Sequence, residues 1–190
     1  MKTIAKTFKK VSFKSALAMV LIGSLALSCS DDDDPEAVDE EEVITTMNIT
    51  LTASGSSITL QSQDLDGDGP NAPTVTVSGD LLANTTYMGS IELLNETETP
   101  AEDITEEVAE EDEEHQFFFS AGGSISDVTY SDQDGNGNPL GIQFSLTTGE
   151  VGNGFLQVTL IHEPKKPNDG TVLDAGGETD IAQQFSLLVQ

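Results

Sequence analysis

Apolar and polar residues alternate along most of the chain after residue 43, and this period of two is the pattern of half-buried β-strands. We predict strands where the alternation is clear, at residues 47–53, 57–61, 74–78, 87–94, 116–121, 125–130, 141–147, 155–162 and 185–189. Turns rich in Gly, Asn and Asp separate these segments. About nine short strands at this spacing predict an all-β domain, an antiparallel β-sandwich of Ig-like or jelly-roll-like type, with a barrel as the alternative.

One segment has helical periodicity instead. A capping box marks its start, with a threonine, a proline at the first helical position and a glutamate at the third: Thr99, Pro100 and Glu102. Three apolar residues then share one helical face, while the other faces are almost wholly acidic: Ala101, Ile104 and Val108. We therefore expect one short acidic helix over residues 100–112, inserted between strands. Its closing acidic residues, 110–114, should make the last turn fray unless a cation lies there.

The first 28 residues have the pattern of a signal peptide. Five lysines and no acidic residue precede an apolar run at 16–27, which is shorter than the roughly 20 apolar residues of a bilayer-spanning helix. The run ends in Leu25-Ala26-Leu27-Ser28-Cys29, which resembles the bacterial lipobox, whose cysteine receives acyl chains such as palmitate and becomes the mature N-terminus. Cys29 is the only cysteine of the chain, and lipidation would remove a thiol that is a liability in an oxidising compartment. A secreted protein with a stray thiol is the alternative.

Beyond Cys29 the chain is strongly acidic. All 34 Asp and Glu residues lie there with only two lysines, which leaves a net charge of −32. Residues 29–42 comprise the acylated cysteine and an acidic stretch with almost no apolar side chains, so we expect a disordered tether. Residues 43–190 then form a single domain. Nucleic acid and anionic lipid surfaces require clustered cations, so this composition excludes both as partners.

Two aspartate-rich turns resemble the first half of a calcium-binding loop. Oxygen-bearing side chains alternate in each turn and a glycine follows: Asp64, Asp66 and Asp68 in the first, Asp132, Asp134 and Asn136 in the second. Val75 and Gln143 occupy the twelfth positions, where an EF-hand has its bidentate glutamate, so neither loop is an EF-hand. Calcium binding and a metal-free turn both remain open for the two loops.

The two histidines of the chain each stand beside a glutamate, as Glu114-His115 and His162-Glu163. On a strand that covers 116–121, His115 would share a face with the alternate phenylalanines. Imidazole and carboxylate groups suit zinc or copper, so these four residues form a candidate transition-metal site. His-x-x-x-His spacing and paired cysteines are absent, and nothing in the sequence brings the two segments together. Strand-edge histidines satisfied by a carboxylate or by solvent are the alternative.

Signatures of catalysis are missing. The chain has no Gly-x-Ser-x-Gly, no phosphate-binding Gly-x-x-x-x-Gly-Lys and no cysteine nucleophile besides Cys29. Its carboxylates are so numerous that no pair stands out as a glycosidase dyad. We therefore expect a non-catalytic protein without an organic cofactor.

Two sets of residues resemble known lipoproteins. Cys29-Ser30 followed by Asp31–Asp34 is similar to the export signal of Bacteroidota surface lipoproteins, whose acidic residues after the lipidated cysteine direct display on the outer face of the outer membrane. The segments LDGDGPNAPTV, ANTTYMGSIELLNETETPAEDITEEV, EEHQFFF, GNPLG, LIHEPKKP and AGGETDI look like a family of small acidic lipoproteins from the same bacteria. Its members carry an automatic label that refers to a type 1 periplasmic-binding fold superfamily. That fold alternates strands and helices over a much longer chain, so the period of two favours a sandwich instead.

Members of this family are often found beside TonB-dependent receptors. The predicted anchor, this resemblance and the two histidine segments together lead us to expect a surface-exposed outer-membrane lipoprotein that captures a small ligand or metal ion for a TonB-dependent uptake system. The aspartate loops support a different hypothesis, a calcium-stabilised structural or adhesive β-module. An enzyme of unknown type ranks third.

Overall fold

The computed structural model describes residues 42–67 and 69–190. The predicted signal peptide, the lipidation site Cys29 and nearly all of the predicted tether lie outside the described residues, as does Asp68. The described residues are mostly strand, and none of their helices is long and apolar enough to cross a membrane.

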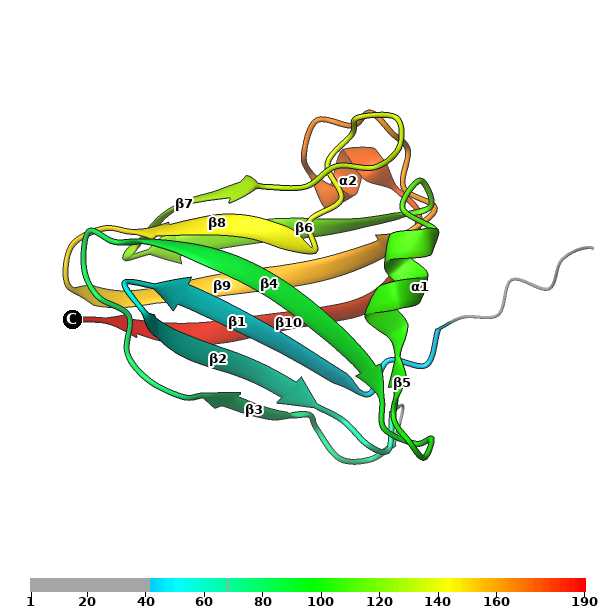
Figure 1. Cartoon of the computed structure of the whole chain (residues 1–190), viewed down its shortest axis with the longest axis horizontal. Helices are drawn as coiled ribbons and strands as arrows, with labels where there is room; N and C mark the ends of the chain where they lie inside the picture. Colours follow the sequence, from blue (N-terminus) through cyan, green and yellow to red (C-terminus); the bar gives the residue numbers. More distant parts are fainter. Residues whose placement is uncertain (1–41, 68) are drawn as a thin grey trace, which may run out of the picture. The chain divides into compact units, whose positions relative to one another are not determined.

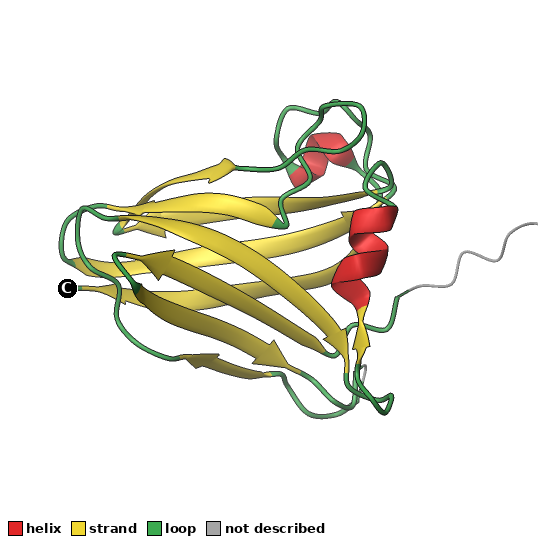
Figure 2. Ribbon diagram, in the orientation of Figure 1, coloured by secondary structure: helices red, strands yellow, loops and turns green. Residues whose placement is uncertain are grey.

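Within the described residues, ten strands form two antiparallel sheets (Figures 1 and 2). The larger sheet has the order β3-β2-β1-β4-β8-β7, with β5 paired to β4. Its strands are β1 (Thr46–Ala53), β2 (Ser56–Gln63), β3 (Thr74–Val77), β4 (Thr86–Asn95), β5 (Glu102–Asp103), β7 (Ile125–Tyr130) and β8 (Gln143–Thr148). The smaller sheet has the order β10-β9-β6. It contains β6 (His115–Gly123), β9 (Gly152–His162) and β10 (Glu178–Val189), and the helices are α1 (Ile104–Glu110) and α2 (Val172–Ala175).

The two sheets share one hydrophobic core. Alternate residues of β1 are fully buried, and so are alternate residues of β9: Met47, Ile49 and Leu51 in β1, Leu156, Val158 and Leu160 in β9. These side chains belong to a single apolar cluster with Phe117 of β6 and Phe185 of β10. Side chains that alternate along strands of both sheets and meet between them make a sandwich. The all-β prediction and its sandwich architecture are therefore confirmed.

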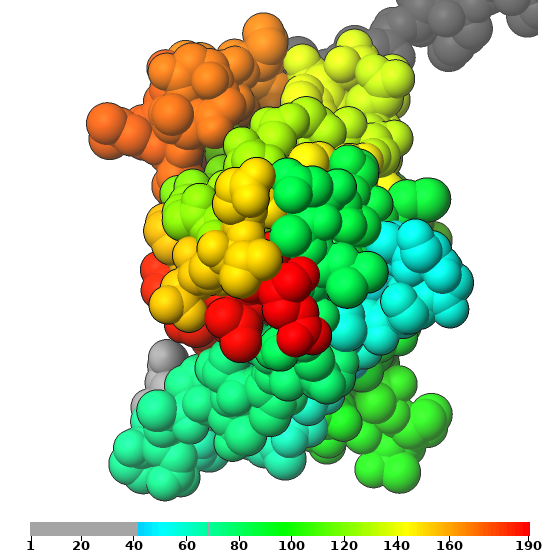
Figure 3. All heavy atoms as spheres, turned by 90° about the vertical axis from the view of Figure 1, so that its left-hand side faces the viewer, coloured from blue at the N-terminus to red at the C-terminus, as the bar shows by residue number. Residues whose placement is uncertain are grey.

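The segment between β3 and β4 ties the larger sheet to the end of β10. Leu81 donates its backbone N–H to Leu188 and accepts from Gln190, both at 2.8 Å, and Ala83 donates to Gln190 at 2.9 Å. Figure 3 shows the C-terminal residues, in red, packed against the green segment that follows β3. Backbone hydrogen bonds thus join the sheets at the end of the sandwich away from α1.

The predicted helix start is wrong. Residue Asp103 is the N-cap and accepts from the N–H of Thr105 at 3.0 Å, so α1 begins at Ile104 and not at Pro100. Glu102 and Asp103 instead pair with β4 as strand β5. The capping box predicted at Thr99 is therefore not used. Residues 102 and 103 pair with β4, and the Asp103 side chain caps the helix instead. Two residues of the predicted apolar face, Ile104 and Val108, are buried, whereas Ala101 precedes the helix and is exposed.

Gly89 in β4 lies directly opposite Phe144 in β8, and the phenylalanine ring fills the space where a Cβ would stand. We expect Gly89→Ala to lower the free energy of unfolding by about 1–3 kcal/mol, because the ring must leave its packed position. Urea unfolding of the purified protein measures this change. Gly149→Ala is the control, since the nearest atoms to its Cβ are 3.8 Å away, and it should cost less than about 0.5 kcal/mol. Equal losses in both variants would contradict the packing argument.

Candidate metal centre

Strands β6 and β9 pair in a register that puts His115 directly opposite His162. The two side chains point to the core-facing side of the smaller sheet, because the neighbours two residues along, Phe117 and Leu160, belong to the core cluster. His115 is fully buried and His162 is 8% exposed. Their rings stack with centroids 4.7 Å apart and planes inclined by 23°. The structure therefore brings together two histidines that are far apart in the sequence.

Glu42, which precedes β1, completes a group of three possible ligands. Its Oε1 lies 3.0 Å from Nε2 of His115, and its side chain is 7% exposed. One ligand atom from each of Glu42, His115 and His162 lies within 4.8 Å of the other two. Two imidazole nitrogens and one carboxylate oxygen form a donor set typical of zinc and copper sites.

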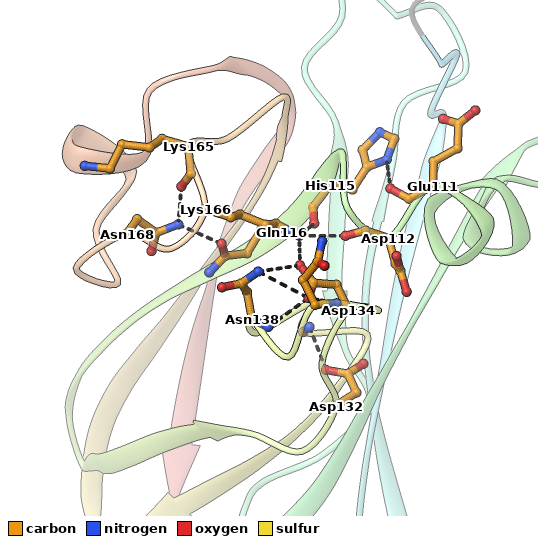
Figure 4. A network of polar contacts seen from close by, with 12 residues as sticks. Glu111, Asp112, His115, Gln116, Asp132, Asp134, Asn138, Lys165, Lys166 and Asn168 are labelled. Carbon is orange, nitrogen blue, oxygen red and sulfur yellow. Dashed lines mark hydrogen bonds and ion pairs between the residues drawn. The ribbon is translucent and has the colours of Figure 1, made fainter.

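The other ring nitrogen of His115 faces the backbone carbonyl of Glu111 at 3.3 Å (Figure 4). A carbonyl oxygen can only accept a hydrogen bond, so Nδ1 carries the proton of the neutral ring. The lone pair of the neutral ring is then on Nε2, the atom that faces Glu42. An imidazole that donates from one nitrogen to a carbonyl and offers the other nitrogen is oriented as metal-bound histidines commonly are.

One oxygen of the Glu42 carboxylate is buried without a hydrogen-bond donor among the described residues. Its Oε2 has no hydrogen-bond partner, and the 3.0 Å contact of Oε1 with His115 Nε2 lacks hydrogen-bond geometry. A buried acceptor without a donor costs about 1–3 kcal/mol, and more for a charged group. Other carboxylates lie near Glu42 and make its surroundings more negative. Burial and the charges of Glu102 and Glu42 raise the pKa of Glu107.

The predicted carboxylate ligands are not part of this group. Glu114 and Glu163 are exposed, and it is their backbones that meet, with the N–H of Glu163 donating to Glu114 at 2.7 Å. Glu114 lies in the turn before β6, and Glu163 follows the end of β9 with a φ of 48°, so neither continues the strand of its neighbouring histidine. Sequence reasoning missed Glu42 because it is the last of a run of acids that all look alike in the sequence.

A buried lysine lies against the backbone of His115. The Lys166 ammonium donates to the carbonyls of Asp112 and His115, both at 2.6 Å, and to Asp134 Oδ2 at 3.1 Å (Figure 4). The carbonyl of Asp112 belongs to the acidic turn after α1. Lys166 is therefore the cation that the negative C-terminal end of the helix was expected to need.

The first aspartate loop connects β2 to β3 and lies outside the histidine group. Asp64 Oδ1 accepts from the N–H of Asp66 at 3.3 Å, and Asp66 Oδ2 accepts from the Asn71 amide at 2.6 Å. The hydrogen bond from Asn71 lowers the pKa of Asp66. Asp68 lies outside the described residues, so calcium binding by this loop stays a prediction.

The second aspartate loop, between β7 and β8, uses its carboxylates internally. Both oxygens of Asp132 accept backbone N–H groups at 2.7 Å, from Gly141 and Gln143. Asp134 Oδ1 accepts from the N–H groups of Asn136 and Asn138 at 2.9 and 2.8 Å. Calcium binding here also stays a prediction, and an ion would compete with these donors and with Lys166.

Burial of Asp134 opposes its ionisation, but the bonds from Asn138 and the Lys166 ammonium outweigh burial and lower its pKa from 3.8 to about 2. The ionised carboxylate therefore stabilises the fold above pH 3.8, and this contribution is lost as the pH falls through about 2. We expect Asp134→Asn to lower the free energy of unfolding by about 3 kcal/mol at pH 7, because Lys166 loses its charged partner. Urea unfolding at a series of pH values should show this deficit shrinking between pH 5 and pH 2. A deficit that is constant over that range would contradict the assignment.

Comparison of the chain with protein-family models, with curated proteins and with solved structures finds no match. The case for a metal centre therefore depends on the residues of this chain alone. Two of them, His115 and His162, were predicted ligands, and the third, Glu42, comes from the structure.

Proposed function

We propose that this protein is a lipid-anchored, non-catalytic binding protein of the outer membrane that captures a transition-metal ion with Glu42, His115 and His162. The observation that carries the proposal is the buried carboxylate of Glu42, whose Oε1 faces a histidine nitrogen and whose Oε2 has no hydrogen-bond donor among the described residues. A proton or a metal ion between this carboxylate and the ring would stabilise both groups.

A proton explains the contact less well than a metal ion does. A proton shared between Glu42 Oε1 and His115 Nε2 would favour a directed hydrogen bond, and the contact does not have that geometry. It would also leave Glu42 Oε2 buried without a partner. A divalent ion beside both oxygens and both rings would balance the carboxylate charge and use the Nε2 lone pair of His115.

One pair of the group already has the spacing that such an ion needs, and all three ligand atoms lie within 4.8 Å of one another. Zinc–ligand bonds of about 2.0–2.2 Å place the ligand atoms of a tetrahedral site roughly 3.3 Å apart. Glu42 Oε1 and His115 Nε2, at 3.0 Å, are already close to this distance. Three protein ligands leave a fourth position open, as in zinc sites that exchange their fourth ligand. Calcium prefers six to eight oxygen ligands, so this nitrogen-rich group favours zinc or copper.

We also propose where the protein is anchored and where the metal ion is delivered. The lipobox at Cys29 and the aspartates after it support an anchor in the outer membrane with display at the cell surface. The excess of acidic residues beyond Cys29 raises the local concentration of cations around the domain. The resemblance to lipoproteins found beside TonB-dependent receptors supports transfer of the metal to such an uptake system.

Zinc should raise the melting temperature of the purified full chain. An ion present at a hundred times its dissociation constant stabilises the folded state by about 2.7 kcal/mol, which corresponds to about 5–11 °C for a domain of this size. We expect His115→Ala, His162→Ala and Glu42→Gln each to remove most of this shift. Differential scanning calorimetry with zinc, copper and calcium measures it.

Glu114→Gln and Glu163→Gln are matched controls, because each removes one carboxylate next to a histidine without touching the proposed ligands. Both variants should keep the full zinc shift. A chain that binds neither zinc nor copper would sink the proposal. Stabilisation by calcium alone, lost on Asp64→Asn and unaffected by His115→Ala, would favour the calcium-stabilised module instead.

A further inference from the structure

We propose that Lys166, held in place by Asp134, is a positioning residue of the metal centre, which it serves by fixing the backbone of His115. This inference rests on the metal-binding function proposed above. It also assigns a role to the second aspartate loop other than calcium binding. Lys166 does not contact the proposed metal position, so it acts only through His115.

The ammonium of Lys166 has three N–H groups, and each has an acceptor. Two acceptors are the carbonyls of Asp112 and His115, at 2.6 Å, and the third is Asp134 Oδ2, at 3.1 Å. The side chains of Lys166 and Asp134 are 7% and 0% exposed. One buried cation therefore joins the turn after α1, the first residue of β6 and the loop between β7 and β8.

These bonds fix the backbone that carries the His115 ring. The ring orientation depends on the Glu111 carbonyl, which meets Nδ1 at 3.3 Å. Lys166 binds the next carbonyl along, that of Asp112, and also the carbonyl of His115 itself. The N–H of Glu163, directly after His162, donates to Glu114 at 2.7 Å. The segment that follows one histidine thus holds the backbone around the other.

Asp134 makes the buried ammonium compatible with a cation site. An unpaired ammonium close to His115 would repel a bound metal ion and would itself be costly to bury. The carboxylate of Asp134 neutralises that charge and is kept in place by the backbone N–H groups of Asn136 and Asn138. The same loop is fixed to β6, since the N–H of Phe117 donates to Leu140 at 2.7 Å. The turn that resembles a calcium loop thus carries an internal ammonium in place of a calcium ion.

The adjacent lysine offers a matched control. Lys165 also forms an ion pair, with Asp174 at 2.8 Å, but its side chain is 59% exposed and does not contact the backbone of His115. Lys165→Met and Lys166→Met change the same residue type and the same charge at neighbouring positions. A difference between these variants therefore reports the contacts of Lys166 and not the net charge of the protein.

The experiment measures zinc affinity by competition with a chromophoric chelator and records the visible spectrum of the cobalt form, with full-length protein. We expect Lys166→Met to weaken zinc binding about 10- to 100-fold, the usual loss when a group that orients a metal ligand is removed. Its cobalt spectrum should change, because the His115 ring is no longer fixed. Lys165→Met should match the wild type in both measurements.

Asp134→Asn provides a second variant in case Lys166→Met does not fold. Asparagine keeps an acceptor for the loop N–H groups but removes the negative charge that holds Lys166. Asp134→Asn should therefore weaken zinc binding, as Lys166→Met does. Wild-type affinity and an unchanged cobalt spectrum in folded Lys166→Met or Asp134→Asn protein would overturn the positioning role of Lys166. They would leave the proposed metal binding intact.

Nitrogen NMR of the metal-free protein separates this inference from the proposed function. The wild type and Lys165→Met should show His115 protonated at Nδ1, and Lys166→Met should show a mixture of tautomers. A wild type that binds neither zinc nor copper overturns the metal function, whereas the tautomer result still decides whether Lys166 orients the ring. Identical tautomers in all three proteins would overturn the positioning role.

Discussion

The pairing of β6 with β9 is the constraint on which the other features depend. Its register places Phe117 opposite Leu160 in the core and His115 opposite His162 at the end of that core. A slip of one residue would turn every side chain of β6 to the other face. The hydrophobic core and the candidate metal centre are thus specified by the same ladder of backbone hydrogen bonds. Packing energy from the phenylalanine fixes the position of a histidine two residues away.

Charge balance is the second constraint, because only two lysines accompany 34 acidic residues beyond Cys29. Both lysines stand side by side after β9, and each pairs with an aspartate. The exposed pair of Lys165 contributes little to stability. Lys166 is different, since it is buried and its hydrogen bonds reach three separate segments. The position of one cation, more than the total charge, therefore decides how the acidic turn before β6 can fold.

The sequence predicted those features that depend on local pattern. Alternation identified most strands and the face that Phe117 shares with His115, because side-chain direction is set within each strand. It did not identify partners, since a period of two is the same whichever strands pair. The helix start was wrong because Glu102 and Asp103 pair with Asn95 and Leu94 of β4, a hairpin-like contact that the capping-box pattern does not include. His115 and His162 were found by residue type, but Glu42 contacts His115 through the fold and has no local signature.

Glu42 stands just outside the first described strand, β1, at a position that the sequence assigns to the tether. A fragment that begins at Val43 would keep every described strand and both histidines, yet it would lose the carboxylate of the group. Cleavage at this point, by a protease or in the laboratory, would remove one of the three candidate ligands and leave the strands of the sandwich whole. A negative binding result from such a shortened chain would therefore say nothing about the intact protein.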